Sequence, residues 1–187
     1  MSTRTRTDEA IVLARFPYGE SSLVVHLCTQ RHGRVHLLAK GAFRPTSGYF
    51  AALDLFDTVE VRWIASPGLG LATCSRASVA ISRRRLARDL ERYRAAEAVL
   101  ALTGLGAREE AADPALFRLA SSTLDALGRS QGEPRVVRLA FEFAFLATMG
   151  VGIALTACAR CGARPDAPAR DGVPFSLADG GRLCARC

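Results

Sequence analysis

The sequence has few of the motifs that usually carry enzymatic chemistry. Its 187 residues include only three histidines, none with a nucleophile in motif context, and no phosphate-binding loop, nucleophile elbow or convergent carboxylate cluster. The N-terminal segment MSTRTRTDEA is polar where a signal peptide needs an apolar core, so secretion is not expected. We therefore expect a cytoplasmic protein that is not an enzyme.

A membrane-spanning segment is also missing from the pattern. The apolar stretch 139–157 contains Glu142 and two glycines, and it leads directly into a cysteine motif. A spanning helix needs about 20 apolar residues with few or no charges. We expect this stretch to form a buried core helix, without membrane contact.

Lysine is nearly absent, yet the chain is basic. Lys40 is the only lysine among 25 basic residues, and the net charge is +7. Residues 1–80 carry nine basic and six acidic groups, and residues 81–94 carry six and two, which gives +3 and +4. A basic surface suits a polyanion, either nucleic acid or an anionic membrane. Arginine adds a planar guanidinium that binds phosphate through two hydrogen bonds and stacks on bases.

Residues 9–75 have the pattern of five short strands separated by turns. In TVEVRWI (58–64), apolar and polar residues alternate with the period of a half-buried strand. The other four expected strands are EAIVLARF, SLVVHLCT, GRVHLLAK and LGLATCS. Five strands in so short a segment favour a small closed barrel, and the OB type is the commonest that binds nucleic acid.

The barrel segment also carries the candidate nucleic-acid contacts. A charged groove with aromatic platforms is typical of single-strand binding, because phosphate contacts give affinity and stacking adds about 1–3 kcal/mol per base. The alternative is that the aromatic residues belong to the core and the arginines only solubilise the surface. The basic candidates are Arg15, Arg34, Lys40, Arg44, Arg62 and Arg76, and the aromatic ones are Phe16, Tyr18, Phe43, Tyr49 and Phe50.

From residue 83 the apolar period becomes helical, which predicts a small helical bundle. The first helix runs from residue 83 until Gly104 and Gly106 end it. Asp113 and Pro114 open a second helix that Gly128 ends, and Glu133 and Pro134 open a third that ends near Gly150. The first helix is expected to bury one face (Leu86, Leu90, Tyr93, Leu100) and to line another with Arg84, Arg88 and Arg92. That arginine row is either a phosphate track or an ordinary solvated face.

The motif CARC occurs twice, at 158–161 and at 184–187, with 22 residues between. Two Cys-x-x-Cys knuckles at such a distance supply four thiolates for one tetrahedral metal, with Zn–S near ~2.3 Å. Four thiolates leave no open coordination position, so we expect a structural Zn²⁺ held by Cys158, Cys161, Cys184 and Cys187, in preference to iron, redox pairs or disulfides.

The other two cysteines, and the arginines near the CARC motifs, have simpler interpretations. Cys28 and Cys74 lie within strand patterns and are expected to be buried apolar side chains. The nearby arginines either offset the negative charge of the thiolates as outer hydrogen-bond donors or are solvated loop residues. These arginines are Arg160, Arg164, Arg182 and Arg186.

Four segments occur in an order and spacing that together are specific. They are PYGESSLVVHLCTQRHGRVHLLAKGAFRP (17–45), LFRLASSTLDAL (116–127), AFEFAFLATMGVGIALTACARCG (140–162) and FSLADGGRLCARC (175–187). In this order they resemble the barrel core, the central helix, the run into the zinc module and the closing knuckle of the bacterial recombination mediator family RecO. The resemblance covers nearly the whole chain.

The resemblance implies an α+β chain with an OB-fold domain (1–80), a helical domain (81–157) and a four-cysteine zinc-ribbon-like element (158–187). It implies binding of single- and double-stranded DNA, annealing of complementary strands, and action with RecR to help RecA replace single-strand-binding protein. The family's basic Lys-Gly-x-x-Arg segment corresponds to Lys40, Gly41 and Arg44, with Arg34 on the preceding turn.

The chain departs from the family pattern at two places. Phe43 and Thr46 stand where further positive charge is common, so this loop is expected to bind DNA less strongly. Family members continue with helices beyond the zinc module, whereas this sequence ends at Cys187, so we expect a partial chain.

Two rival functions remain open. One is a zinc-ribbon module of transcription or translation that binds RNA or protein. The other is an adaptor whose positive charge binds an acidic protein tail.

Overall fold

The computed structural model describes residues 5–44, 46–49, 52–65, 71–129, 131–164 and 172–187. The chain divides into two compact units, Met1–Glu142 and Phe143–Cys187, and each is described by itself. Of the expected features, Phe50 and the first two residues of the strand LGLATCS (69–75) lie outside the described residues.

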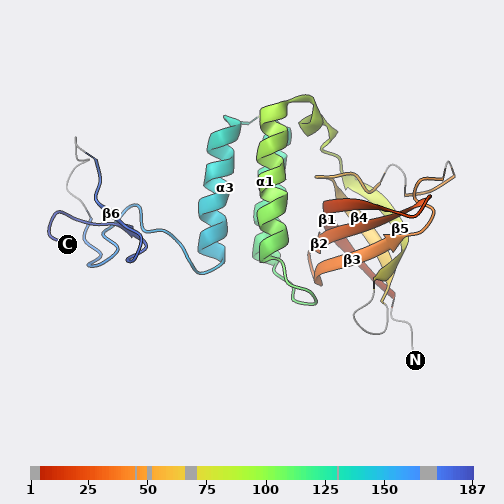
Figure 1. Cartoon of the computed structure of the whole chain (residues 1–187), viewed down its shortest axis with the longest axis horizontal. Helices are drawn as coiled ribbons and strands as arrows, with labels where there is room; N and C mark the ends of the chain where they lie inside the picture. Colours follow the sequence, from red (N-terminus) through yellow and green to blue (C-terminus); the bar gives the residue numbers. More distant parts are fainter. Residues whose placement is uncertain (1–4, 45, 50–51, 66–70, 130, 165–171) are drawn as a thin grey trace. The chain divides into compact units, whose positions relative to one another are not determined.

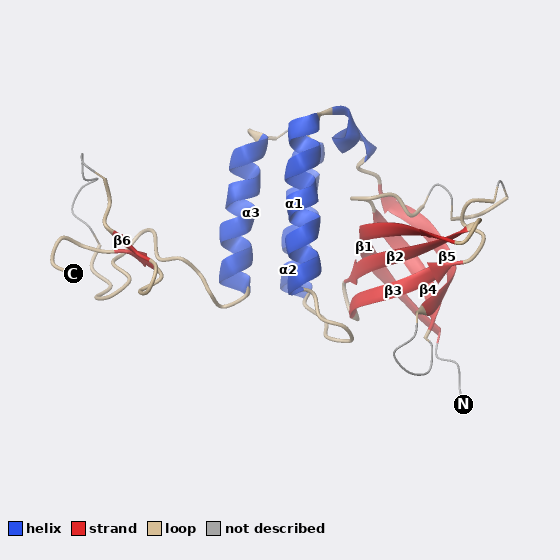
Figure 2. Cartoon of the chain, viewed as in Figure 1, coloured by secondary structure: helices blue, strands red, loops and turns tan. Residues whose placement is uncertain are grey.

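The first unit begins with a closed five-stranded barrel, as the sequence predicts (Figures 1 and 2). Neighbouring strands follow the order β1-β2-β3-β5-β4, and β4 pairs back onto β1. Among the barrel strand pairs that the structure describes, only β3–β5 is parallel. This is the OB arrangement. The strands are β1 (Thr5–Tyr18), β2 (Ser22–Thr29), β3 (Gly33–Ala39), β4 (Thr58–Ile64) and β5 (Ala72–Ile81).

Strand β1 is longer than expected because it serves two neighbours. Its first half pairs with β4 from Thr5 to Ile11, and its second half pairs with β2 from Ala10 to Tyr18. A register shift between Val12 and Ala14 marks a bulge, which bends the strand around the barrel. Strand β5 also extends beyond the predicted end at residue 75, to Ile81.

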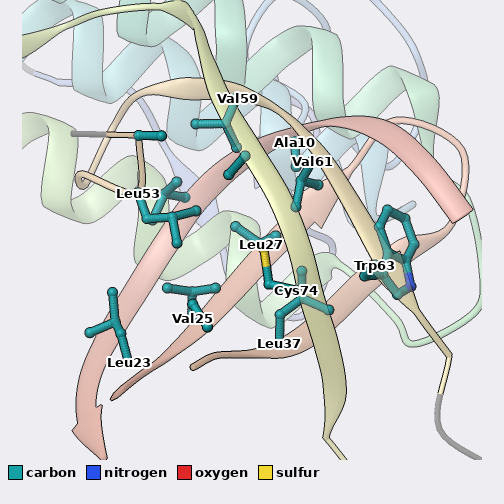
Figure 3. Packing of buried hydrophobic residues seen from close by; sticks show 14 of the residues in the cluster. Ala10, Leu23, Val25, Leu27, Leu37, Leu53, Val59, Val61, Trp63 and Cys74 are labelled. Atoms are coloured by element: carbon teal, nitrogen blue, oxygen red, sulfur yellow. The ribbon is translucent and has the colours of Figure 1, made fainter. Parts of the chain in front are cut away.

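The barrel interior is filled by the inward-facing residues of all five strands. Figure 3 shows Val25, Leu27, Leu37 and Cys74 facing one another across it. In β4 the predicted alternation is confirmed, because Val59, Val61 and Trp63 are buried while Glu60 and Arg62 are exposed. Burial raises the thiol pKa of both Cys28 and Cys74 to about 12, so neither is a reactive thiol near neutral pH.

The helical segment begins differently from the prediction. One continuous helix from residue 83 is wrong: a 3₁₀ turn, η1 (Arg84–Arg88), is followed by α1 (Leu90–Gly106). Asp89 interrupts them in an extended conformation, and its carboxylate accepts hydrogen bonds from the N–H groups of Glu91 and Arg92. Arg84 and Arg88 therefore do not share a helix face with Arg92. Leu90 is 61% exposed, because it opens α1 and does not continue the face of Leu86.

The other two helices begin and end near the predicted residues. The expectation of a buried core helix over 139–157 is wrong, because the third helix ends at Thr148 and Leu139 and Leu155 are 50% and 45% exposed. Helix α2 (Pro114–Gly128) is capped by Asp113, whose carboxylate accepts from the N–H of Leu116 at 2.9 Å. Helix α3 (Pro134–Thr148) begins after Glu133, whose side chain accepts from the N–H of Val136 at 3.0 Å. Within the described part of the chain, none of the helices is long and apolar enough to cross a bilayer.

A buried arginine joins the barrel to the helices, and no sequence pattern predicts it. The Arg83 side chain is 2% exposed and donates to Phe56 O and Thr58 Oγ1 of the barrel, each at 2.8 Å. The same guanidinium donates to Asp125 at 2.7 Å and to Ser121 Oγ at 3.0 Å, both on α2. One side chain therefore connects the barrel to α2.

A stacked pair of histidines lies on the outer side of β2 and β3. The rings of His26 and His36 are 4.0 Å apart with 22° between their planes, and Phe16 packs against His26 at 4.9 Å. Burial is the main cause that lowers the pKa of both histidines. For His26, repulsion from His36 and then from Arg34 lowers the pKa further. For His36, Glu109 partly opposes the lowering and Arg34 adds to it.

Acidification is therefore expected to destabilise the barrel. Because the folded-state pKa lies below the ordinary value of about 6.5, the unfolded chain binds more protons as the pH falls through that value. The stabilisation is present above the unfolded-state pKa and is lost as the pH falls towards the folded-state values. The urea concentration at the unfolding midpoint should be lower at about pH 5.5 than at about pH 7.5. This difference should be smaller in the variant His26→Gln/His36→Gln than in wild type. An equal decrease in the variant would contradict this origin.

Candidate metal centre and nucleic-acid interface

The second unit brings the four predicted cysteines together. The Sγ atoms of Cys158, Cys161, Cys184 and Cys187 all lie within 4.8 Å of one another, and those of Cys161 and Cys184 are 3.7 Å apart. Tetrahedral coordination with Zn–S near 2.3 Å requires S···S distances of about 3.8 Å. All six cysteines are free thiols. The cluster has the geometry to hold one metal ion, and within the described residues it is the only such group.

Tight turns position the thiols of both knuckles. In the first, Gly162 has φ +73°, and its N–H donates to Cys158 O at 2.8 Å while Cys158 N donates to Ala163 O at 2.8 Å. This is the left-handed conformation expected of a glycine after the second cysteine. In the second knuckle, Cys187 N donates to Cys184 O at 3.1 Å.

At Cys158, the first of the four cysteines, the thiolate form is favoured over the thiol. Backbone N–H groups, that of Cys161 most and that of Cys184 next, lower the pKa of the Cys158 thiol to about 6. In the same cluster, hydrogen bonds with the neighbouring cysteine side chains, that of Cys184 most, raise the pKa of the Cys187 thiol to about 12. A metal binds the thiolate, so binding near neutral pH would still displace the proton of Cys187.

Arg160 joins the two knuckles through its guanidinium. It pairs with Asp179 at 3.0 Å and donates to Cys187 O at 3.2 Å, and Asp179 also accepts from Ser176 Oγ at 2.6 Å. Arg182 donates to Leu155 O at 3.3 Å. Arg160 therefore connects the first knuckle to the second. That the arginines near the knuckles offset the negative charge of the thiolates stays a prediction.

The hairpin β6–β7 holds the second knuckle against the segment before the first. Strand β6 (Phe175–Ser176) pairs with β7 (Gly181–Arg182), and Gly181 also bridges to Ala154. A Cβ built on Gly181 would lie 2.4 Å from Ala154 O, so only glycine permits this approach.

On the barrel, a groove of 570 Å³ collects three basic side chains. Lys40 and Arg44 follow β3, Arg76 lies on β5, and the hydroxyl residues around them are Thr46, Ser47, Ser75 and Ser78. We call this the barrel groove. None of the three basic residues forms an ion pair with a carboxylate of the described residues. Three positive charges are therefore available to an anionic ligand.

A glycine turn places the first two of these charges. Gly41 has φ +69°, and the N–H of Arg44 donates to Gly41 O at 3.0 Å. A Cβ on Gly41 would lie 3.2 Å from Cδ of Arg44, so the arginine side chain folds closely over the glycine. The Lys-Gly-x-x-Arg pattern thus has a structural basis in one compact turn.

Arg62 extends the positive surface along the barrel. It lies directly opposite Arg76 in the β4–β5 pair, and its Nε donates to Thr7 Oγ1 at 3.4 Å. Like charges opposite one another on a sheet repel, and a bound anion would relieve that repulsion.

Three of the remaining predicted arginines have partners within the protein, whereas Arg88 forms no ion pair with a carboxylate of the described residues. Arg15 pairs with Asp54, and Arg84 pairs with the same carboxylate at 3.8 Å. Arg34 donates to Gly104 O at 3.0 Å and pairs with Glu109 at 3.6 Å. A role of these residues in binding nucleic acid stays a prediction.

Arg34 helps a loop after α1 to pack on the β2–β3 turn. Its N–H donates to Arg108 O at 2.8 Å. Its neighbour Gly33 has φ +70°, and a Cβ there would lie 2.2 Å from Arg108 O. Gly33 is therefore needed both for the turn and for its contact with the helical segment.

The aromatic candidates divide between surface and core. Phe16, Tyr18 and Phe43 are 48%, 58% and 39% exposed, so their rings are accessible for stacking. Tyr49 lines the barrel groove, but it packs against the core cluster and donates its hydroxyl to Cys74 O at 3.1 Å.

Comparison with known proteins matches both parts of the chain. Residues 1–83 match the family described as Recombination protein O N terminal, and residues 87–187 match Recombination protein O C terminal. The two matches meet close to the predicted boundary at residue 80, and the division into three domains (1–80, 81–157, 158–187) stays a prediction.

Individual relatives agree over nearly the whole chain, and each is named DNA repair protein RecO. The protein from Geobacter metallireducens is 38% identical over 100% of this chain and 72% of its own length. Those from Exiguobacterium sp. and Streptomyces avermitilis are 34% and 32% identical, over 94% and 96% of this chain and 68% and 73% of their own lengths. The name describes a repair protein and no catalysed reaction. The OB barrel, the four-cysteine cluster and these matches together show that the chain belongs to the RecO family.

Proposed function

We propose that this chain is a recombination mediator that binds single- and double-stranded DNA and anneals complementary strands. In the same proposal it acts with RecR to help load RecA onto DNA coated by single-strand-binding protein, at the chromosome in the cytoplasm. The observation that carries the DNA-binding part is the barrel groove, where Lys40, Arg44 and Arg76 converge without carboxylate partners among the described residues. The RecO family names support the role in repair.

Binding through this groove contacts the phosphate backbone of the nucleic acid. Lysine and arginine contacts to phosphate are independent of base sequence and release counterions, which makes affinity decrease steeply with salt. A protein that anneals arbitrary complementary strands needs such contacts, because the base edges must remain free to pair. Exposed Phe16 and Phe43 add stacking surfaces without sequence preference. No step of this mechanism requires turnover chemistry.

The cysteine cluster has a structural role in this proposal. Cys158, Cys161, Cys184 and Cys187 hold one Zn²⁺, which their four thiolates saturate. The ion would fix the geometry of the two knuckles and supply no reactive position.

The DNA-binding proposal is tested by Lys40→Ala/Arg44→Ala/Arg76→Ala. Because each lost phosphate contact removes about 0.7 from the slope of log K against log[salt] for single strands, three contacts should reduce the slope by about 2. Affinity should fall alike for oligonucleotides of every sequence. Fluorescence anisotropy across a salt series measures both quantities.

A charge-matched control separates this groove from the overall charge. Arg94, Arg118 and Arg138 are exposed helix residues outside the barrel groove, and their triple alanine variant should keep most of the slope. Equal losses in both variants, or tighter binding of RNA than of DNA with no strand annealing, would reject the proposal. The second outcome would favour the RNA-binding module.

A further inference from the structure

A second basic groove lies among the helices, and it does not share residues with the barrel groove. It has a volume of 240 Å³ and is formed by the end of η1, the start of α1 and the end of α2. Its four arginines are Arg85, Arg88, Arg92 and Arg129. We call this the helical groove.

One of its arginines is fixed in place by the fold. Arg92 is 16% exposed, and its guanidinium donates to Leu127 O and Gly132 O, each at 3.4 Å. It also faces Asp89 at 3.6 Å, the only acidic residue in the lining. The Asp89 carboxylate is already engaged in capping α1. Arg92 therefore provides a preorganised charge at the base of the groove.

The other three arginines surround this base and are exposed. Arg85, Arg88 and Arg129 form no ion pair with any carboxylate in the described residues, although Asp89 is nearby. Clustering like charges is unfavourable without a counter-charge. The groove therefore has the electrostatic character of a polyanion site.

The chemistry of the lining favours a phosphate backbone over an acidic peptide. Protein partners are usually anchored by an apolar or aromatic residue in a desolvated pocket. Among the described residues of the lining, Leu127 is the only large apolar one, and it is fully buried and offers no such pocket. Several guanidinium groups instead match successive phosphate oxygens, each through two hydrogen bonds.

We propose that the helical groove binds the phosphate backbone of a second DNA strand while the barrel groove binds the first. This inference rests on the proposed DNA-binding function and adds a second site to it. Arg76 of the barrel groove and Arg85 of the helical groove are nine residues apart, so their Cα atoms lie at most about 30 Å from each other. Two strands held in this way have their repulsion screened within reach of one another, as annealing requires.

The test uses the full chain and the variant Arg85→Gln/Arg129→Gln. Neither side chain makes a hydrogen bond or ion pair within the described residues, so the substitution should leave the fold intact, which circular dichroism checks. An oligodeoxythymidylate of about 10 nucleotides, which cannot pair with itself, should saturate at two per wild-type chain at low salt and at one per variant chain. The annealing rate of complementary strands should decrease about 10-fold, with the affinity for the first strand changed less than about 2-fold.

Control variants decide between the possible outcomes. Arg94→Gln/Arg118→Gln removes the same charge elsewhere and should keep two strands and fast annealing. If Arg85→Gln/Arg129→Gln also keeps both, or if wild type binds only one strand, the second site does not exist although DNA binding stands. If the variant loses only binding of a polyglutamate peptide, the groove is a protein site and the inference is wrong. If wild type binds no DNA, the proposed function fails first.

Discussion

Cys158→Ser is expected to abolish metal binding and to unfold the region around the knuckles. Among described residues 149–164 and 172–187, only Cys158 and Gly181 are buried, so this region has almost no apolar core. Segments of this size fold only with a staple such as a metal or a disulfide, and all the cysteines here are free thiols. Structural zinc contributes about 10–16 kcal/mol of binding free energy in comparable small sites.

The measurement combines metal analysis with limited proteolysis. Wild type should contain one zinc per chain, and Cys158→Ser should contain much less than one and be cleaved within residues 149–187 at least about 10 times faster. A chelator should reproduce the cleavage in wild type. Cys74→Ala is the matched control, because its thiol lies in the barrel core and should leave zinc content unchanged. Full zinc content in Cys158→Ser, or protection that survives chelation, would contradict the structural role.

The barrel shows what local sequence pattern predicts well. In β4, the alternation of Val59, Val61 and Trp63 with polar residues follows directly from one buried and one exposed face. The four cysteines are likewise predicted to meet, because two Cys-x-x-Cys knuckles match the ligand pattern of one tetrahedral metal, and their Sγ atoms do lie within 4.8 Å of one another. Asp113 and Pro114 predict a helix start because capping is a local interaction.

One local cap and several long-range contacts explain the differences. Asp89 divides the predicted first helix because its side chain caps α1, and the same arginine-rich pattern would fit an unbroken helix equally well. Arg85 and Arg129 are far apart in sequence, so no spacing rule brings them into one groove. Gly181 reads as an ordinary hairpin glycine, and its close approach to Ala154 depends on a partner 27 residues away.

Arg83 is the clearest of these cases, and replacing it gives the second large effect. Its neighbours Arg84 and Arg85 are exposed, and nothing in the run Arg-Arg-Arg marks the first as buried. Its burial is compensated by Asp125 together with the acceptors Phe56 O, Thr58 Oγ1 and Ser121 Oγ. Phe56 itself has φ +72°, a conformation costly for a non-glycine residue, and its carbonyl is held by this arginine.

Arg83→Met is expected to lower the free energy of unfolding of the first unit by about 3–5 kcal/mol. Methionine keeps the aliphatic stem but leaves Asp125 and the barrel acceptors without their donor, and breaking one side of a buried pair carries a cost of this size. Urea unfolding followed by the fluorescence of Trp63, the only tryptophan, measures it. Arg84→Met is the adjacent control: its side chain is 60% exposed and its ion pair is 3.8 Å long, so the change should stay within about 1 kcal/mol.

A second substitution separates the ion pair from general packing. Arg83→Met/Asp125→Leu removes both charges, so the double variant should recover part of the loss seen in Arg83→Met. If the double variant loses as much free energy of unfolding as Arg83→Met and Asp125→Leu lose together, the contact between the barrel and α2 contributes no coupling. The coupling between Arg83 and Asp125 should therefore determine whether the barrel and the helices unfold together. In wild type, the unfolding transitions followed by Trp63 fluorescence and by helical circular dichroism should coincide. In Arg83→Met they should separate into two transitions.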